Sequence, residues 1–468
     1  MELTSQSMET WLRRLLGAAP DSPRMVVQEY LDGIPQLEPL ADVPRGTRVV
    51  VRGDLDAKPG ATLGEGDIRL RSMQETLDYG RNQGWVQVIF GHIGRDPNGS
   101  LDKVRDRLAE ILQCEVVFLA DWLDPQTTTI LDEAAAKIQS AQPGSVLLLE
   151  NTRKYDVETV LWKVKPDGIP AVAPRLAKLA NEFARKIGRV YVNEAFSAGS
   201  LDSSTIVVPA AMDRVALGKY VAGQFLGPLM DCLDAQLVVS SGLKIDKLDD
   251  LEAMINRGSV RWVFTAGSLA CGLKKAAAQL EGRDFPIGVA EDPAHADKPY
   301  YIPAARLEQA GKMIAEGRAK GIEFVIPVDF VLQDGRVSQT IGPADQQFDV
   351  GPATGELFQR KVGEFLDKTK RSGRPAVAFH NGVLGMFEDP RFEEGTKRFM
   401  AQLKRMHDAG VRVYVGGGEG GKALEKYGKP DWVTHNFTAG GTVLNALGSE
   451  PVPYLVSLWM ANRRGNQT

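Results

Sequence analysis

The stretch Val411–Gly428, VRVYVGGGEGGKALEKYG, joins a strand pattern, a run of glycines and a helix pattern. Val411, Val413 and Val415 alternate as the residues of a buried strand do, and Lys422–Tyr427 consists of good helix formers. Glycines at such a junction let backbone N–H groups approach an anion, which also meets the positive end of the helix dipole. The stretch therefore predicts a phosphate-binding turn, or else a turn that serves only close packing.

Length and composition indicate a large globular protein. The 468 residues are 43% hydrophobic, which is enough to bury cores in about two to four domains. A net charge of −4 gives no electrostatic footprint for nucleic acid. The sequence has no run of about 18 apolar residues that could span a membrane. Its three cysteines fit a reducing compartment better than a zinc site, so we expect a cytoplasmic protein.

Strand and helix patterns alternate from Arg48 onward, and the alternation restarts after Gly227-Pro228. Such alternation is typical of parallel α/β sheets. We therefore expect two Rossmann-like three-layer α/β/α domains with parallel sheets, joined by a hinge helix near Tyr220–Cys232. The expected strands are Val49–Arg52, Val86–Phe90, Glu115–Leu119, Val146–Leu149, Val190–Asn193, Leu237–Ser240, Trp262–Thr265, Glu323–Pro327, Ala376–Phe379 and Arg412–Val415.

The ends of the chain stand apart from this alternation. Residues 1–42 form an N-terminal helical extension, in which Ser22-Pro23 predicts the start of a second short helix. The extension is interpreted as an appendage packed on the main body, with a partner-docking arm as the alternative. The two domains are expected at 43–222 and 223–452, and the tail 453–468 is expected to return to the N-terminal domain.

Basic and polar residues follow the predicted strands of the first half. Ligands of open α/β sheets bind beyond the carboxyl ends of the strands, so these residues converge on one crevice. Arginine binds phosphate and carboxylate in a two-pronged way, and the cluster therefore suits a small molecule that carries both. Its members are Arg52, Asp54, Asp56, Arg69, His92, Arg95, Glu150, Arg153 and Glu194.

Small residues follow the strands of the second half, as a polyphosphate requires. They are Ser240-Ser241-Gly242, Ala266-Gly267-Ser268 and Gly416–Gly421. Lys244 and Lys247 supply point charges, and Glu419 is the candidate ligand of a magnesium ion, a cation that favours carboxylate and phosphate oxygens. A compact-anion site and a polyphosphate site together indicate phosphoryl transfer, with domain closure that expels water.

Ten stretches in order identify the chain as similar to phosphoglycerate kinases over roughly residues 40–460. They are VVVRGDLDAKPG, FGHIGRD, VLLLENTRKYD, YVNEAFSAGS, SGLKIDKL, IPVDFVLQDG, DVGPAT, HNGVLGMFE, VGGGEGGKALEKYG and FTAGGTVLNALG. The resemblance implies Mg²⁺-dependent phosphoryl transfer between ATP and the carboxylate of 3-phosphoglycerate, giving ADP and 1,3-bisphosphoglycerate. It implies a 3-phosphoglycerate-binding first domain, a nucleotide-binding second domain and a monomer.

The resemblance also assigns roles to individual residues. Arg69, Lys247 and Lys244 match catalytic positions, Arg69 as the stabiliser of the transferring phosphoryl group. The implied substrate-binding residues are Asp54, Leu55, Asp56, Arg69, His92, Ile93, Gly94, Arg95 and Arg153. The implied nucleotide-binding residues are Lys247, Gly267, Asn381, Glu388, Gly416, Gly417, Gly418, Glu419 and Gly420, with Glu419 as the metal ligand.

Several positions depart from the family pattern. The stretch SAGSLDSST is one residue short and has Leu201 where the family has a His-Arg pair that grips the substrate phosphate. Losing a charged hydrogen-bonding partner costs about 1.5–3 kcal/mol. Asp56 replaces asparagine, and Glu419-Gly420 replaces Asp-Thr. Lys244 and Lys247 are three residues apart rather than four, and Ser240-Ser241 and His380 also differ.

The sequence is also compatible with other functions. One is a protein that binds nucleotide or an anion, catalyses poorly and acts through partners. Another is a kinase for a different carboxylic acid, which Leu201 makes conceivable. The third is a nicotinamide-dependent oxidoreductase, because Gly416, Gly418 and Gly421 fit a GxGxxG fingerprint. That fingerprint requires an acidic residue about 20 positions later, and Thr434–Ala439 contains none, so we reject it.

Overall fold

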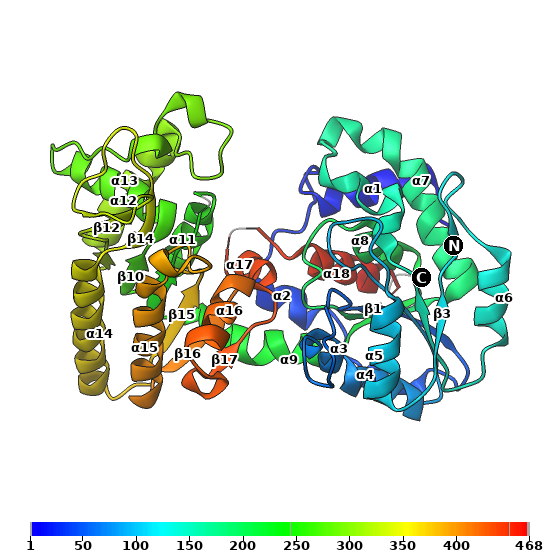
Figure 1. Cartoon of the computed structure of the whole chain (residues 1–468). Helices are drawn as coiled ribbons and strands as arrows, with labels where there is room; N and C mark the ends of the chain where they lie inside the picture. Colours follow the sequence, from blue (N-terminus) through cyan, green and yellow to red (C-terminus); the bar gives the residue numbers. More distant parts are fainter. Residues whose placement is uncertain (1, 244, 449, 466–468) are drawn as a thin grey trace. The chain divides into compact units, whose positions relative to one another are not determined.

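The computed structural model describes residues 2–243, 245–448 and 450–465. The chain divides into two compact units, each with its own parallel sheet flanked by helices (Figure 1). Unit 1 runs to Leu226 and includes the chain from Pro451 onward, and unit 2 spans Gly227–Glu450. The expectation of two α/β domains with parallel sheets is confirmed. The change of unit falls in a helical segment made of α9 (Lys219–Gln224), a π-helical turn (Phe225–Leu229) and α10 (Met230–Leu233).

The main sheet of unit 1 has six parallel strands in the order β3-β6-β2-β1-β7-β8. The chain first places β2, β3 and β6 on one side of β1, with β6 between β2 and β3, and then adds β7 and β8 on the other side. A ligand crevice is expected where the order reverses, beyond the carboxyl ends of β1 and β7. The strands are β1 (Arg48–Gly53), β2 (Val86–Phe90), β3 (Val116–Leu119), β6 (Val146–Leu149), β7 (Val190–Glu194) and β8 (Arg214–Leu217).

The helices of unit 1 include elements from both ends of the chain. α1 packs on α7, and α18 packs on α2, α8 and β8. The predicted second helix of the extension begins at Val27 and not after Ser22, because the Glu29 carboxylate accepts the Val26 N–H there. The helices are α1 (Ser5–Leu15), α2 (Val27–Asp32), α3 (Ile68–Ser72), α4 (Gln74–Asn82), α5 (Asp102–Leu112), α6 (Asp132–Ser140), α7 (Ile169–Glu182), α8 (Ser203–Ile206) and α18 (Pro453–Gly465).

The main sheet of unit 2 repeats this plan with the order β11-β10-β9-β15-β16-β17, again parallel throughout. Its order reverses between β9 and β15. The strands are β9 (Leu237–Ser240), β10 (Trp262–Thr265), β11 (Glu323–Val325), β15 (Val377–Asn381), β16 (Arg412–Gly416) and β17 (His435–Asn436). The helices are α11 (Lys247–Asn256), α12 (Gly267–Leu280), α13 (Ala304–Ala319), α14 (Pro352–Ser372), α15 (Glu394–Asp408), α16 (Gly418–Tyr427) and α17 (Gly440–Leu447).

Two small antiparallel sheets were not predicted. In unit 2, β12 (Phe330–Leu332) lies between β13 (Val337–Ser338) and β14 (Gln347–Val350). In unit 1, β4 (Leu123–Asp124) pairs with β5 (Thr129–Ile130). The antiparallel strands of two to four residues are too short to show the period of two that marks a half-buried strand, whereas the buried parallel strands appear as continuous apolar runs.

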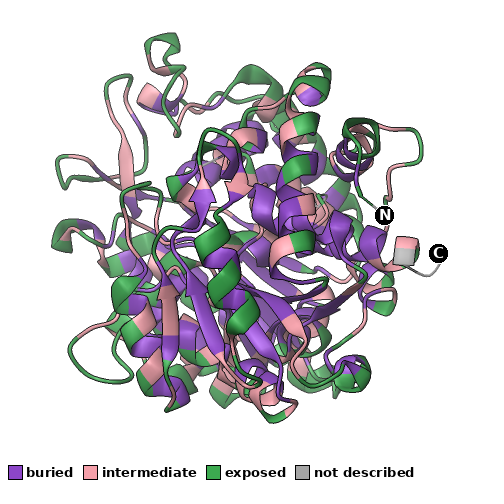
Figure 2. Ribbon diagram, turned by 90° about the vertical axis from the view of Figure 1, so that its right-hand side faces the viewer, coloured by how far each residue is buried: buried purple, intermediate pink, exposed green. Residues whose placement is uncertain are grey.

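Apolar side chains from the sheets and helices form the cores. Figure 2 shows the strands as buried and the outer helices as exposed on the faces that point away from the sheets. In unit 2, Phe264 on β10 meets Phe358 on α14 edge-on at a centroid distance of 5.3 Å. Phe399 on α15 packs against Phe358 at 5.7 Å. Among the described residues, no helix combines the length and apolar character needed to cross a bilayer.

Candidate active site

Arg69 lies beside the chain that follows β1 in unit 1 and is held by two carboxylates. It sits in α3, and its Nη1 donates to the Asp56 carbonyl at 3.0 Å and to Asp56 Oδ2 at 3.1 Å. Asp54 Oδ1 lies 3.8 Å from the same nitrogen. The Arg69 side chain remains 25% exposed, so the guanidinium is oriented by the protein and is still accessible from solvent.

Asp56, which replaces the family's asparagine, has a defined structural role. Its Oδ1 accepts the Gly94 N–H at 2.9 Å while its Oδ2 accepts from Arg69. Burial would raise the pKa of Asp56, but the Gly94 N–H and the Arg69 charge outweigh it and lower the pKa below its usual value. The extra negative charge is thus neutralised by Arg69, and Asp56 connects the chain after β1 to the loop after β2.

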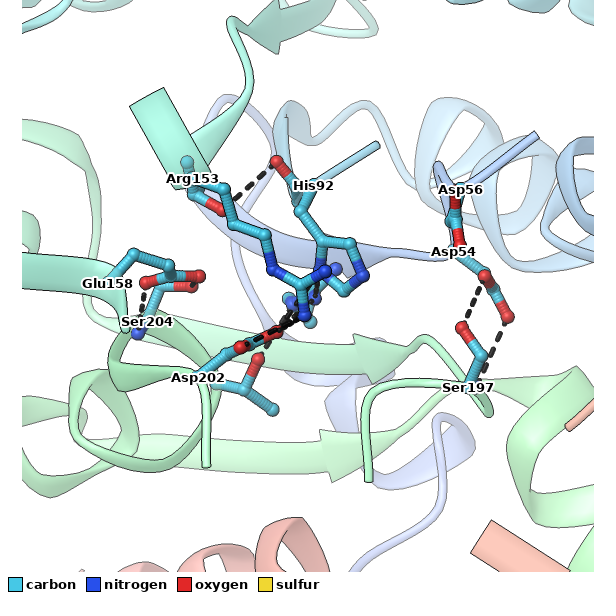
Figure 3. A network of polar contacts seen from close by, with 12 residues as sticks. Asp54, Asp56, His92, Arg153, Glu158, Ser197, Asp202 and Ser204 are labelled. Atoms are coloured by element: carbon cyan, nitrogen blue, oxygen red, sulfur yellow. Dashed lines mark hydrogen bonds and ion pairs between the residues drawn. The ribbon is translucent and has the colours of Figure 1, made fainter. Parts of the chain in front are cut away.

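Asp54 joins the two strands that flank the reversal point. Its carboxylate accepts from Ser197 Oγ at 2.7 Å and from the Ser197 N–H at 3.2 Å (Figure 3). Asp54 follows β1 and Ser197 follows β7, so this contact lies where the strand order predicts a ligand crevice. The neighbouring Leu55 is buried in the apolar core, where its side chain fixes the turn and does not face solvent.

The other substrate-binding candidates of unit 1 divide into buried and exposed ones. His92 is buried after β2, and Arg153 sits on a short 3-10 turn after β6 whose start is capped by Asn151 Oδ1. Ile93 and Gly94 are half-buried beside them. Arg95 is exposed, and within the described part of the chain it forms no ion pair.

Arg52, His92 and Arg153 converge on a carboxylate of the chain itself, Asp202. Arg153 Nη2 donates to Asp202 Oδ2 at 3.0 Å and to Oδ1 at 3.2 Å. His92 Nδ1 lies 3.1 Å from Asp202 Oδ2 (Figure 3), and Arg52 Nη2 lies 3.7 Å from the same oxygen. Trp162 Nε1 also donates to Asp202 Oδ1, at 3.0 Å. Asp202 is fully buried.

The ionisation states of this cluster follow from its surroundings. Burial would raise the pKa of Asp202, but the His92 hydrogen bond and the Arg153 and Arg52 charges lower it well below its usual value. Burial lowers the pKa of His92, and the Arg52 charge adds to this against the opposing bond to Asp202. His92 Nδ1 lies 2.9 Å from Arg52 Nη2 as well. A neutral ring can accept from Arg52 or donate to Asp202 through this nitrogen, but not both at once.

Asp202, Trp162 and Glu158 were not among the residues singled out from the sequence. Glu158 is buried and accepts from Ser204 N and Ser204 Oγ at 2.8 and 2.6 Å. The stretch SAGSLDSST offered one signal, because it places an acidic residue next to the position where the family has a basic pair. The contact between Asp202 and Arg153 spans 49 residues of chain, so no local sequence pattern predicts it.

The glycine turn of unit 2 forms the start of a helix, as the sequence predicts. Gly417 precedes α16 with a φ of +109°, which favours glycine. Asn381 Nδ2 donates to the Gly416 carbonyl at 2.9 Å and so fixes the end of β16. Gly418 and Glu419 are exposed in the first turn of α16, while Gly420 is buried. Gly417 and the first turn of α16 therefore form the glycine-led helix start that an anion site requires.

Lys247 lies where the strand order of unit 2 reverses. It is the first residue of α11, and its Nζ donates to the Ser241 carbonyl at 2.6 Å and to Asn381 Oδ1 at 2.9 Å. Ser241 follows β9 and Asn381 ends β15, so the ammonium group spans the two central strands. Lys244, the other predicted catalytic lysine, lies outside the described residues.

A cavity of about 360 Å³ opens beside these groups. Three of the predicted nucleotide-binding residues line it, namely Gly267, Glu388 and Glu419. Gly267 starts α12 with a φ of +65°, and a Cβ there would come within 2.5 Å of the Gly242 carbonyl oxygen. The apolar part of the wall, suited to a planar base, consists of Pro299, Tyr300, Phe348, Val383, Leu384 and Met386.

The carboxylates of this cavity fit a magnesium ion that arrives with a nucleotide. Mg²⁺ is usually held by one or two carboxylates together with substrate phosphates and water. Glu419 and Glu388 supply such carboxylates at the cavity wall. Among the described residues, no cluster of three or more histidine, cysteine or acidic side chains could hold a metal by itself. The donor set therefore fits a nucleotide-bound ion.

Two α/β units, each with polar groups at the reversal point of its own parallel sheet, define a class of two-domain proteins with one ligand site per domain. The chain belongs to the phosphoglycerate kinase family, whose model, described as "Phosphoglycerate kinase", matches residues 40–450. It is 27% identical over 428 residues to the phosphoglycerate kinase of Clostridium beijerinckii, covering 88% of this chain and 96% of that protein. It is 28% identical over 434 residues to the cytosolic phosphoglycerate kinase of Triticum aestivum, with the same two coverages.

Solved structures support the same fold. The phosphoglycerate kinase of Pyrococcus horikoshii OT3 matches with a TM-score of 0.68 at 23% identity, covering 92% of this chain and all of that one. The phosphoglycerate kinase of Coxiella burnetii matches with a TM-score of 0.63 at 21% identity, covering 88% of this chain and 96% of that one. At such identities the likeness concerns the fold.

Proposed function

We propose that this chain is a kinase that moves a phosphoryl group between ATP and a carboxylate, with 3-phosphoglycerate as the acceptor implied by the family. The observation that carries the proposal is the pair of sites at the reversal points: Arg69 in unit 1, and Lys247 beside the glycine-led helices in unit 2. Phosphoryl transfer depends mainly on positioning and charge neutralisation, which are what these residues can provide.

The proposed roles follow from the contacts. An acceptor carboxylate oxygen attacks the γ-phosphorus, and the bond from that phosphorus to the bridging oxygen of ADP breaks. Arg69, oriented by Asp56, offers N–H donors to the transferring group. Lys247 and the N–H groups of Gly417, Gly418 and Gly420 hold the nucleotide phosphates. Glu419 would hold magnesium together with the phosphates, and the ion would neutralise charge on the nucleotide. The reaction requires the two sites to meet, which is the role we assign to hinge closure.

The setting proposed for this reaction is the cytoplasm, with the protein acting as a monomer on two small molecules. The Triticum aestivum relative is described as cytosolic, which supports the first point. Nucleic acid and membrane have no part in the proposal.

A coupled assay tests the proposal directly. Purified protein with ATP, Mg²⁺ and 3-phosphoglycerate should form 1,3-bisphosphoglycerate. Arg69→Ala should abolish turnover and leave the affinity for ATP nearly unchanged, because Arg69 lies in unit 1. Arg71→Ala is the matched control, since Arg71 is exposed on the same helix α3. Turnover by Arg69→Ala at the wild-type rate would refute the role of Arg69.

A second candidate is a kinase for a different carboxylic acid. The observation that favours it is the engagement of Arg153 by Asp202, because the family resemblance assigns Arg153 to the acceptor. Wild-type protein that binds ATP but phosphorylates neither 3-phosphoglycerate nor any other carboxylic acid would instead favour the nucleotide-binding protein without catalysis.

A further inference from the structure

A buried carboxylate occupies the centre of the basic cluster of unit 1. Asp202 receives the two-pronged contact from Arg153 and the neighbouring contacts of His92, Arg52 and Trp162. Arg-carboxylate pairing of this form is how a protein receives an anionic ligand. Here the anion is supplied by the chain, and the exposed fraction of its side chain is zero.

The N–H donors of the two arginines are largely used within the protein. Arg153 Nη1 donates to the Gly94 carbonyl at 2.6 Å, and its guanidinium carbon lies 4.8 Å from the centre of the Trp162 ring. Arg52 donates from Nε to Thr205 Oγ1 at 2.7 Å and from Nη1 to the Gly53 carbonyl. Among the nitrogen atoms of Arg52 and Arg153, both of which the structure describes, only Arg153 Nε is buried without a partner. One N–H group cannot replace the several that a phosphate group requires.

The charges of the cluster are also balanced. Two guanidinium groups face Asp202, and the buried Glu158 lies close enough for the two carboxyls to influence each other. Burial, reinforced by the Asp202 charge, raises the pKa of Glu158. The cluster therefore carries a net charge between about zero and +1, which offers little attraction to a phosphate dianion.

This cluster belongs to the same strand-end edge as Arg69. Arg52 lies in β1, His92 follows β2 and Arg153 follows β6, and these strands are neighbours in the sheet. His92 also acts electrostatically on Asp56, the residue that orients Arg69. A second anionic group on an acceptor bound at Arg69 would be directed to this cluster.

We propose that Asp202 fills this second anion position from within the chain, so that the acceptor is recognised through its carboxylate, and carboxylic acids without a phosphate group are accepted as well as 3-phosphoglycerate. Asp202 is then the residue that determines acceptor specificity. The inference rests on the proposed function, because it concerns the acceptor of the same reaction. It adds to that function that a phosphate group on the acceptor gains no charged contact from the protein.

Glycerate and 3-phosphoglycerate are the matched probes, since they differ only in the phosphate group. Calorimetry with wild-type protein should give the two acids affinities within about threefold of each other, because the phosphate gains no charged contact. Such a contact usually raises the affinity by a factor of about ten or more. Binding of 3-phosphoglycerate more than about tenfold tighter than glycerate would overturn the inference. This comparison of the two acids uses the unaltered protein, so its result does not depend on how a variant folds.

Replacing Asp202 should open the anion position that its carboxylate fills. Asp202→Asn removes the charge at nearly constant volume, and Asp202→Ala also opens space. Each folded variant should bind 3-phosphoglycerate and inorganic phosphate at least about tenfold more tightly than wild type, with glycerate unchanged. Asp156→Asn is the control, because Asp156 pairs with Arg175 in the same unit but is exposed. Folded variants without this gain would refute the inference.

Binding and turnover separate the two proposals. If the phosphate-dependent gain appears in the Asp202 variants while no protein phosphorylates any acid, the specificity inference holds and the proposed kinase function fails. If wild-type protein phosphorylates 3-phosphoglycerate and prefers it to glycerate in binding, the kinase function holds and the inference fails.

Discussion

Buried carboxyl groups occur in two kinds of surroundings in this chain. Asp202 lies among guanidinium groups, which stabilise its charged form and lower its pKa. Glu194 and Asp349 are buried where uncharged groups, the Thr76 hydroxyl and backbone N–H groups, are the donors, and burial raises the pKa of each to about 7. Opposite charge outweighs burial in the first case, whereas hydrogen bonds to neutral donors do not outweigh it in the others.

Glu194 should make stability depend on pH. It ends β7 and accepts the N–H groups of Tyr220 and Val221 at the start of α9, at 3.0 and 3.2 Å. Between its unfolded pKa of 4.5 and its folded pKa of about 7, the folded state keeps a proton that the unfolded state has lost. The free energy of unfolding therefore falls as pH rises through this window, by about 3 kcal/mol in total for this group.

Chemical denaturation at a series of pH values between about 4.5 and 8 measures this slope. Glu194→Gln should reduce the slope between these values, because the group no longer titrates. Glu75→Gln, which changes an exposed carboxylate paired with Lys219, should leave it unchanged. A variant at position 194 that keeps the full wild-type slope would show that Glu194 does not titrate in this range.

At the scale of elements, three helices of unit 2 begin at glycines near the predicted nucleotide site. These starts are Gly267 of α12, Gly418 of α16 and Gly440 of α17. A Cβ on Gly440 would lie 2.1 Å from Gly417 Cα, which is far inside van der Waals contact. Close approach of the two turns therefore requires glycine at position 440.

Gly440→Ala should separate these turns and weaken nucleotide binding. Forcing a methyl group into packed backbone costs about 1–3 kcal/mol, so we expect a lower melting temperature for unit 2 and weaker binding of ATP with Mg²⁺. Gly441→Ala is the matched control, because a Cβ there meets no atom within 4 Å. Equal effects of the two substitutions on ATP affinity, measured by calorimetry, would contradict the packing argument.

The sequence predicted the buried parallel strands better than the short antiparallel ones. Val86–Phe90, Val146–Leu149, Leu237–Ser240 and Trp262–Thr265 were predicted with the bounds that the structure has, because buried parallel strands are continuous apolar runs. The pattern of Leu70–Gln83 predicts one helix, whereas the structure divides this segment at Met73 into α3 and α4. β8 was not predicted.

At the scale of the whole chain, ligands of open α/β sheets bind beyond the carboxyl ends of the strands. This rule located the basic and glycine-rich clusters because it depends only on where strands end. It could not give the partners of those residues. Asp54 meets Ser197 and Arg153 meets Asp202 across 143 and 49 residues, and such contacts exist only once the sheet order is known. The order itself depends on crossovers that no local pattern encodes.

The end of the chain completes unit 1, and its removal should affect that unit selectively. α18 buries Tyr454, Leu455 and Leu458. Ser457 Oγ donates to the Ile206 carbonyl at 2.9 Å, and Asn462 Nδ2 donates to the Gly33 carbonyl at 2.9 Å. These partners belong to the N-terminal part of the chain, so unit 1 depends on both ends of the sequence.

Leu458→Ala should therefore lower the stability of unit 1 by about 2–5 kcal/mol, the usual cost of truncating a fully buried leucine. Since each unit has its own core, we expect calorimetry to resolve two transitions. ATP with Mg²⁺ should raise the transition of unit 2 by binding its folded state, which assigns the other transition to unit 1. Leu280→Ala, at a leucine 49% exposed at the end of α12, should move neither by more than about 0.5 kcal/mol. If Leu458→Ala lowered the ATP-sensitive transition instead, α18 would stabilise unit 2 rather than unit 1.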